Sequence, residues 1–211
     1  IASAFYGHPS RKMRMVGITG TKGKTTTSYL LKSIVDAAGA GSGLIGSIGN
    51  WIKDKREPGN LTTPDPIELN EILKRMYDSG VEIVCMEVSA HAIDMNRIAG
   101  IHYSVGAFTN FSQDHLDYFE TMEKYFSAKE KFMLSDVVEN AVINVDDDKL
   151  AAIFSKLKCP RLSYGISRNS DIFARNIDIV DKGISFDLVL SGQNVGKINM
   201  NLMGNFNVYN A

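Results

Sequence analysis

The sequence predicts an α/β fold in which a mostly parallel sheet, containing a phosphate-binding loop, carries helices on both faces. Short apolar segments alternate with helical patterns between residues 14 and 157, and a glycine-rich turn joins the first segment to the first helix. After about residue 159 the pattern changes to three strand-like segments separated by short turns. Alternating strands and helices are typical of parallel sheets, whereas the consecutive strands indicate a small antiparallel region, expected within residues 160–203.

Apolar runs and helical periodicity define the individual elements. The run VEIVCM is continuous, as expected for a strand covered on both faces, and apolar residues three or four apart indicate helices. The expected parallel strands are residues 14–19, 43–48, 81–86, 103–108 and 141–145, and the expected helices are residues 25–38, 66–79, 90–98, 121–134 and 147–157. The expected antiparallel strands are residues 172–180, 184–190 and 195–202, joined by Lys182-Gly183 and Ser191-Gly192.

Two connections in the first half of the chain have local signatures. Residues 53–59 (KDKREPG) are polar and are expected to form a loop. Asp65 and Pro66 have the order of a helix start, with a capping aspartate before a proline at the first helical position. Glu68 completes a capping box, so the helix is expected to begin with side-chain caps.

The composition excludes several classes of protein. The 211 residues are 44% hydrophobic and 22% charged, and a net charge of -1 gives no overall attraction to nucleic acid or anionic lipid. No apolar run approaches the roughly 20 residues that span a bilayer, and no signal peptide opens the chain. Cys85 and Cys159 lack the spacing of a zinc site or a disulfide framework. We therefore expect a cytoplasmic protein without nucleic-acid or membrane partners.

The glycine-rich turn GTKGKT has the chemistry of a polyphosphate site. Gly20 and Gly23 allow the backbone to approach a ligand closely, and free N–H groups at the start of the helix favour anions. Lys24 supplies a cation for the β- and γ-phosphates, while the Thr25 hydroxyl can bind Mg²⁺. Ile18 stands where the strict Walker pattern has its first glycine, so the turn is the shorter GTxGKT variant. The alternative is a glycine-rich turn with a solvated lysine.

Charged residues near the ends of later strands are further candidates. Glu87 ends the run VEIVCME, at the edge where ligands of parallel sheets gather, and a carboxylate there can hold Mg²⁺. His115 follows another strand, flanked by acids that could fix its orientation. A strand-end acid can also point into solvent, and a lone histidine in a polar loop is more often structural; His91 and His102 receive no metal role. From its local pattern alone, Lys129 is an exposed helical lysine.

Six segments together resemble the Mur ligases. GTKGKTTT, LTTPDP, MEVSAHAIDMNR, FTNFSQDHLDYF followed by SAK, INVDDD and GNFNVYNA occur in the order and approximate spacing of that family, and look most like the UDP-N-acetylmuramoyl-tripeptide synthetases (MurE type). The match runs from about Met15 to Ala211. The resemblance implies that residues 1–211 are a central ATP-binding domain, with an N-terminal UDP-binding domain and a C-terminal amino-acid-binding domain lying outside them.

The resemblance also implies the residues that bind each ligand. The matching positions make Thr25 and Glu87 ligands of one Mg²⁺, and His115 and a Lys129 carbamylated by CO₂ ligands of a second. Catalytic roles fall to Lys24, Glu87, His115 and Lys129. The implied ATP-binding residues are Gly20, Thr21, Lys22, Gly23, Lys24, Thr25 and Thr26, with Asn207 and Asn210 near the adenine. The implied residues for the UDP-muramoyl-peptide are Thr62, Thr63, Ser89 and Arg97, of which the arginine is suited to a bidentate grip on an anion.

Four positions depart from the family pattern. Lys22 replaces the usual Asn of GTNGKT, and Leu61 replaces an Asn that often precedes the two threonines. Ala90 replaces the second Ser of EVSSH, and Met95 stands where a Gln often contacts the substrate. These changes concern the details of substrate contacts and leave the expected metal and phosphate groups unchanged.

The function implied by the resemblance is the addition of a third amino acid, meso-diaminopimelate or L-lysine, to UDP-N-acetylmuramoyl-L-Ala-D-Glu through an acyl phosphate formed with ATP. The partners are then small molecules, and we expect a monomer whose 211 residues alone lack full ligase activity. One alternative is another ligase of the superfamily, such as a folylpolyglutamate synthase, which would be expected to lack TTPD and EVSxHAxxxxR. The other is a nucleotide-binding module without ligase activity, which has no need of Glu87, His115 and Lys129 together.

Overall fold

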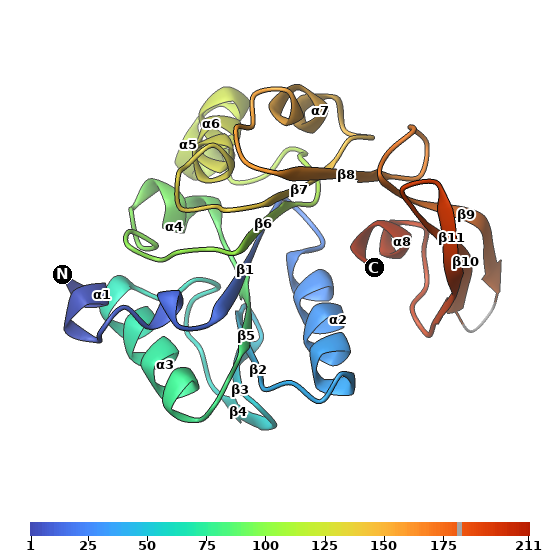
Figure 1. The fold of residues 1–211 in the computed structure, drawn as a ribbon. Coiled ribbons are helices and arrows are strands. Elements are labelled where there is room, and N and C mark those ends of the chain that lie inside the picture. The colour runs from blue at the N-terminus through green and yellow to red at the C-terminus, as the bar shows by residue number, and fades with distance from the viewer. Residues whose placement is uncertain (181–182) are drawn as a thin grey trace.

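The computed structural model describes residues 1–180 and 183–211, and it confirms the predicted α/β architecture (Figure 1). Within these residues eleven strands form one sheet in the order β11-β10-β9-β8-β7-β6-β1-β5-β2-β3-β4. The strands are β1 Arg14–Thr19, β2 Ser42–Gly46, β3 Gly49–Ile52, β4 Lys55–Glu57, β5 Ile83–Glu87, β6 Val105–Phe108, β7 Ala141–Asn144, β8 Arg161–Gly165, β9 Ile172–Val180, β10 Gly183–Leu190 and β11 Gln193–Met200.

Helices lie on both faces of the sheet. Figure 1 shows the sheet curving so that α2 and α8 lie on its inner side, whereas α3, α4, α6 and α7 lie on the outer side. The helices are α1 Ala2–Phe5, the 3-10 helix η1 Pro9–Arg11, α2 Lys24–Ala37, α3 Pro66–Asp78, α4 Ala90–Asp94, α5 Leu116–Phe119, α6 Met122–Met133, α7 Asp148–Phe154 and α8 Phe206–Asn210. In the described part of the chain, every helix is too short or too polar to cross a membrane.

The central strand β1 determines where polar side chains can converge. It pairs in parallel with both β5 and β6, and its register places Ile18 beside Glu87 and Thr19 beside Phe108. The three strands therefore end at the same edge of the sheet, which is where parallel sheets bind ligands. Ile18, Glu87 and Phe108 are fully buried, so this edge is covered on both faces.

Gly17 in β1 lets one helix approach the sheet unusually closely. A Cβ at this position would lie 2.7 Å from Cδ1 of Tyr103 and 2.9 Å from Cζ of Phe132. Those two rings fill the space instead, packed edge to face with centroids 5.1 Å apart. Because Phe132 belongs to α6, the missing side chain determines how near α6 lies to β1.

The three predicted antiparallel strands are present, but they continue the main sheet. β9 and β10 pair antiparallel, as do β10 and β11. The link to the parallel part is the parallel pairing of β8 with β9, which consists of Tyr164 with Ile172 and Gly165 with Phe173. A turn at residues 191–192 joins β10 to β11 as predicted; of the predicted turn Lys182-Gly183, the first residue lies outside the described residues.

Some local predictions are wrong. Residues 53–59 do not form a simple loop, because β3 and β4 make a hairpin in which Trp51 pairs with Arg56. Charged side chains suit β4 because this strand is the exposed edge of the sheet. Pro66 does open α3, but the Asp65 side chain makes no capping hydrogen bond. Strand β8 and helix α5 have no counterpart in the prediction, and the helix expected at residues 90–98 ends at Asp94.

Candidate functional site

The turn between β1 and α2 has the conformation of an anion-binding loop. Helix α2 begins at Lys24, and the preceding Gly23 adopts a left-handed conformation with φ of 85°. No side chain caps this helix, so the N–H groups of its first turn have no intrahelical acceptors and can bind an anion. Asn110, just past β6, supports the loop by accepting a 2.9 Å hydrogen bond from the Lys22 N–H.

Lys24 folds back over this loop. Its Nζ donates hydrogen bonds of 2.9 Å to the carbonyls of both Gly20 and Thr21. Burial lowers the pKa of Lys24 from its usual value, while the nearby Glu87 and Asp114 act in the opposite direction. A polyphosphate in the loop would offer this ammonium charged acceptors, which bind more strongly than neutral carbonyls.

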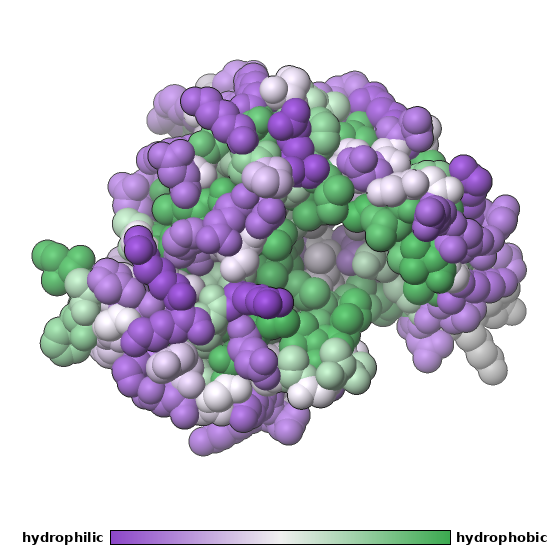
Figure 2. Space-filling view, viewed as in Figure 1, coloured by the Kyte–Doolittle hydropathy of each residue, from purple (hydrophilic) through white to green (hydrophobic). Residues whose placement is uncertain are grey.

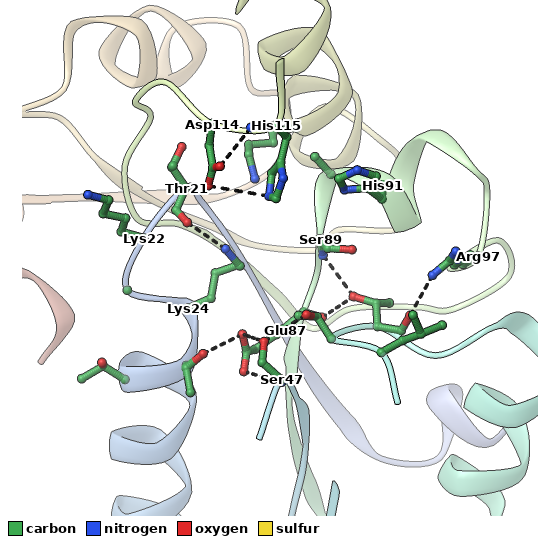
Figure 3. A pocket seen from close by; sticks show the side chains of 18 residues that line it. Thr21, Lys22, Lys24, Ser47, Glu87, Ser89, His91, Arg97, Asp114 and His115 are labelled. Carbon is green, nitrogen blue, oxygen red and sulfur yellow. Dashed lines mark hydrogen bonds and ion pairs between the residues drawn. The ribbon is translucent and has the colours of Figure 1, made fainter. Parts of the chain in front are cut away.

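Glu87 is a fully buried carboxylate at the end of β5. Its Oε2 accepts a 2.9 Å hydrogen bond from the Thr25 hydroxyl, and its Oε1 accepts a 3.0 Å hydrogen bond from the Ser47 N–H (Figure 3). The Ser47 hydroxyl also donates to Oε2 at 3.2 Å. Among the described residues, no ion pair joins Glu87 to a basic side chain. The alternative of a solvated strand-end acid is therefore wrong.

Lys129 is also buried, contrary to its predicted exposure. Only 1% of the residue is exposed, and its Nζ donates a 2.8 Å hydrogen bond to the carbonyl of Gly20. The Nζ lies 4.9 Å from the centroid of the Tyr125 ring. Burial lowers the pKa of Lys129 well below its usual value, and the Lys24 ammonium lowers it further. Helical spacing gives a signal for this burial, because Lys129 is four residues from the buried Tyr125 and Met133.

His115, at the start of α5, lines the same cavity as Lys129. It has a left-handed backbone with φ of 52°, and its Nε2 is 3.7 Å from Oδ2 of Asp114. The imidazole packs edge to face against His91, with ring centroids 4.8 Å apart, and against Tyr125 at 5.8 Å. These contacts fix the ring in the lining of the cavity while leaving 44% of its side chain exposed.

The residues expected to bind the second substrate are linked to Glu87 through Thr63. The Thr63 hydroxyl donates a 2.7 Å hydrogen bond to the Glu87 carbonyl and accepts one of 3.1 Å from the Ser89 N–H. Arg97 donates from Nη1 to the Thr63 carbonyl at 3.5 Å, and its Nε is 3.1 Å from Oδ1 of Asp65. Asp65 thus pairs with this arginine instead of capping α3.

These elements enclose one cavity of about 610 Å³. Figure 3 shows Lys24, Glu87, Ser89, Arg97 and His115 converging on it from separate elements. The predicted site residues that line it are Thr21, Lys22, Gly23, Lys24, Thr25, Thr26, Thr62, Thr63, Glu87, Ser89, Arg97, His115 and Lys129. Gly20, Asn207 and Asn210 do not line it.

Three further polar residues line the cavity although the sequence-based site omits them, namely Ser47, His91 and Asp114. Ser47 follows β2, which is parallel to β5, so its place after a neighbouring strand is the signal that could have identified it. His91 lies against His115 and Tyr118. Burial lowers the pKa of His91, and the nearby His115 lowers it further.

The two asparagines of α8 lie next to the loop on the other side of Gly23. A Cβ at Gly23 would overlap Oδ1 of Asn210, so only glycine allows this approach. Asn210 donates from Nδ2 to Oδ1 of Asn207 at 2.9 Å, and Asn207 donates to the carbonyl of Met203 at 2.8 Å. Both asparagines are buried.

Side chains of the described residues do not make a complete metal centre by themselves. No group of three or more His, Cys, Asp or Glu that could hold a metal occurs in that part of the chain. A cation near Glu87 would therefore need hydroxyl or phosphate oxygens as additional ligands. The arrangement can thus hold a polyphosphate and its cation at the loop, with an anionic second substrate reaching from Arg97.

Comparison with known proteins agrees with this geometry. Residues 18–211 match the family described as the Mur ligase middle domain. The UDP-N-acetylmuramoyl-L-alanyl-D-glutamate–2,6-diaminopimelate ligase of Clostridium botulinum is 37% identical over 211 residues, covering 100% of this chain and 43% of that protein. A solved structure of a ligase with the same name has a TM-score of 0.84 at 29% identity, over 94% of this chain and 41% of that chain.

More distant structures share the fold alone. A folylpolyglutamate synthase of Mycobacterium tuberculosis, solved with ADP and AMPPCP, has a TM-score of 0.76 at 17% identity, over 99% of this chain and 55% of that chain. The chain spans less than half the length of the curated relatives that it matches, 43% in the case of the Clostridium botulinum ligase.

Proposed function

This chain belongs to the Mur ligase family, and we propose that it is the ATP-binding unit of a ligase that adds the third amino acid to UDP-N-acetylmuramoyl-L-Ala-D-Glu. The observation that carries this proposal is the cavity where the phosphate loop, Glu87, Lys129 and Arg97 meet. The relative's name specifies 2,6-diaminopimelate as its amino acid. L-lysine stays as the alternative for this chain, because the residues that select the amino acid are expected in a further domain.

The proposed reaction has two chemical steps. An oxygen of the substrate carboxylate attacks the γ-phosphorus of ATP, and the bond from this phosphorus to the β,γ-bridging oxygen breaks. ADP departs, and the substrate is now an acyl phosphate. The amino group of the incoming amino acid then attacks the acyl carbon, loses a proton and expels inorganic phosphate from a tetrahedral intermediate. Lys24 and the amides of the loop would stabilise the charge that develops on the phosphoryl oxygens. Binding of adenine nucleotides by a protein of the same fold supports this assignment.

The residues present fit one divalent cation as they stand and a second only after modification. Glu87 and Thr25 fit the first, because the buried carboxylate has a hydroxyl neighbour and no basic partner among the described residues. His115 and Lys129 fit the second only if Lys129 is carbamylated, because an ammonium repels a cation. Bound Mg²⁺ would neutralise the triphosphate as a carboxylate approaches it.

The environment of Lys129 supports carbamylation. In this reaction the neutral amine forms a bond to the carbon of CO₂ and its nitrogen loses a proton, leaving an anionic carbamate. The neutral form of the amine is favoured because burial holds the pKa of Lys129 well below its usual value. The described residues also contain no ion pair to Lys129 that would favour the ammonium.

The carbamate is tested by carbon NMR of protein equilibrated with ¹³C-labelled bicarbonate. We expect a carbamate resonance in the wild-type protein that disappears in Lys129→Arg. Lys131→Arg, an exposed lysine of the same helix, should keep the resonance. A resonance that survives Lys129→Arg would place the modification elsewhere and remove Lys129 from the metal site.

The substrate-binding residues form the second part of the proposal. Thr62, Thr63, Ser89 and Arg97 would bind the UDP-muramoyl-dipeptide, and they line the same cavity as Glu87 and the loop. Leu61 and Ala90, two of the departures from the family pattern, line the same cavity and remove polar groups from it. We expect the remaining contacts of this substrate and of the amino acid to come from the flanking domains of a longer protein.

The ligase is tested by phosphate release from the full-length protein with ATP, Mg²⁺ and UDP-N-acetylmuramoyl-L-Ala-D-Glu. Candidate amino acids are added one at a time. Release that requires both the nucleotide-sugar dipeptide and one amino acid supports the proposal and identifies the amino acid. Release with a folate and glutamate would favour a folylpolyglutamate synthase, and ATP binding without release in any combination would favour a nucleotide-binding module.

A further inference from the structure

Asp146, two residues beyond the end of β7, joins several separate segments. Its carboxylate accepts hydrogen bonds from the backbone N–H groups of residues 166–168, at 2.6, 2.8 and 2.8 Å. Its Oδ2 also accepts a 2.9 Å hydrogen bond from the Tyr209 hydroxyl. Asp146 lies outside the cavity lining, so phosphate or metal binding does not account for these four donors.

Three side-chain contacts fix the position of α8, and the hydrogen bond from Tyr209 is one of them. Val208 packs with the Ala174, Ile184 and Phe186 cluster of β9 and β10, Asn210 lies against Gly23, and Tyr209 reaches Asp146. Figure 1 accordingly shows α8 between α2 and the antiparallel strands.

A chain of hydrogen bonds connects Asp146 to the phosphate loop from the opposite direction. The Asp146 N–H donates to Oδ1 of Asn144 at 3.0 Å, and Nδ2 of Asn144 donates to the Thr109 carbonyl at 2.9 Å. The Thr109 hydroxyl donates to the Lys22 carbonyl at 2.7 Å. The loop is thus connected to α8 on both sides, directly at Gly23 and indirectly through the ends of β6 and β7.

The asparagines held by this helix have the chemistry to recognise a base. A carboxamide offers a donor and an acceptor side by side, which matches N7 and N6–H₂ of adenine but not N7 and O6 of guanine. Asn210 and Asn207 are already oriented by their mutual hydrogen bond. A shift of α8 would move both amides while leaving Lys24 and Glu87, which belong to other elements, in place.

We propose that Tyr209 is a positioning residue whose hydrogen bond to Asp146 sets α8 for recognition of the adenine base. This inference rests on the proposed function, in that the loop binds ATP. Tyr209 acts through Asn210, so its contribution concerns the base and not the phosphates. Two ligands separate an effect on the base from an effect on the phosphates. ATP contains both the base and the phosphates, whereas inorganic tripolyphosphate contains only the phosphates.

The test uses Tyr209→Phe, which removes only the hydroxyl. Displacement of a fluorescent ATP analogue by ATP, GTP and tripolyphosphate is measured on the folded protein. We expect ATP affinity to fall about fivefold to tenfold, with tripolyphosphate affinity unchanged and ATP preferred less strongly over GTP. Tyr118→Phe, which removes a similar 2.8 Å hydrogen bond to Asp94 and lies away from α8, should leave all three affinities unchanged.

A second variant tests whether Tyr209 acts through Asn210. Asn210→Ala and the double variant Tyr209→Phe/Asn210→Ala should show the same ATP affinity. Once the Asn210 carboxamide is absent, loss of the Tyr209 hydroxyl cannot shift it and has no further effect on affinity. Additive losses, equal losses for ATP and tripolyphosphate, or no loss in Tyr209→Phe would each overturn the positioning role while leaving the proposed function intact. Wild-type protein that fails to bind ATP would overturn both.

Discussion

The parallel part of the sheet, made of β1, β2 and β5 to β8, and the antiparallel extension, β9 to β11, contribute to the site in different ways. The parallel part buries charged groups next to the loop, including Glu87 and Lys129. The extension has instead a small apolar cluster around Ile184 and Phe186, and β11 is exposed along most of its length. Figure 2 shows apolar residues over the region where Figure 1 places α8, while the outer surface is largely hydrophilic.

The difference follows from how the strands are connected. Parallel strands all end at one edge, so their following loops bring polar side chains together. Hairpin strands alternate in direction and cannot do so. The extension can act on the site only by supporting something else, which is α8 with its two asparagines. We therefore expect changes in the parallel part to alter chemistry and changes in the extension to alter stability or nucleotide affinity.

The largest expected effect is the loss of Lys24 from the parallel part. Lys24→Ala should reduce phosphate release by about 1,000-fold, near 4 kcal/mol of transition-state stabilisation, because the loop loses its cation. Thermal unfolding should change little, since the ammonium bonds only to loop carbonyls. Lys74→Ala, in an exposed ion pair with Asp78, is the matched control. Activity near that of the wild type in Lys24→Ala would remove the loop from the mechanism.

The next effect concerns the extension and tests its independence. Phe186→Ala should lower the free energy of unfolding by about 3 kcal/mol, because a 3% exposed ring leaves a cavity. Hydrogen exchange should accelerate in β9 to β11 while β1, β5 and β6 stay protected. Equal acceleration across the whole sheet would show that the two parts unfold as one unit and would remove the distinction drawn between them.

A stability gain is expected from Lys129→Met in buffer depleted of CO₂. Since burial lowers the pKa of Lys129 from 10.5, the folded protein binds fewer protons than the unfolded chain between the lowered pKa and 10.5. Lys129 therefore destabilises the fold most at low pH, and the penalty decreases as the pH rises toward 10.5. Chemical denaturation should show Lys129→Met more stable by about 2 kcal/mol at neutral pH. A difference that is absent, or that grows with pH, contradicts this account.

The smallest effect distinguishes the two substrates within the parallel part. Arg97→Lys should raise KM for the nucleotide-sugar dipeptide about tenfold, because lysine cannot make a bidentate contact with an anion. KM for ATP should be unchanged. Arg75→Lys, which alters an exposed ion pair with Glu57, is the control. A rise in KM for ATP of the same size would assign Arg97 to the nucleotide instead.

The same contrast explains how much the sequence predicts. Strand and helix alternation, the GTKGKT loop and the strand-end Glu87 are local patterns, and they predicted the parallel architecture and the centre of the cavity. Strand β4 of the β3–β4 hairpin is charged because it lies at a solvent-exposed edge of the sheet, so no apolar run marks it. Asp65 has the pattern of a cap, but a distant arginine competes for its carboxylate.

Burial of polar residues is harder to predict, because it depends on distant parts of the chain. The segment SAKEK reads as an exposed helix surface, yet Lys129 reaches the carbonyl of Gly20, 109 residues away. The role proposed for Tyr209 depends in the same way on Asp146, 63 residues away in the sequence. Neither pairing is visible in local spacing.

Gly17 has a consequence for where functional positions can lie. It has no charge, no polar side chain and no place in the cavity lining, so a survey of reactive groups would pass over it. Yet any side chain there would displace the Tyr103 and Phe132 rings and push α6 outward. The Nζ of Lys129, one turn earlier on α6, would then lose its 2.8 Å contact with the loop. The spacing between this lysine and the phosphate loop is therefore encoded by an absent side chain.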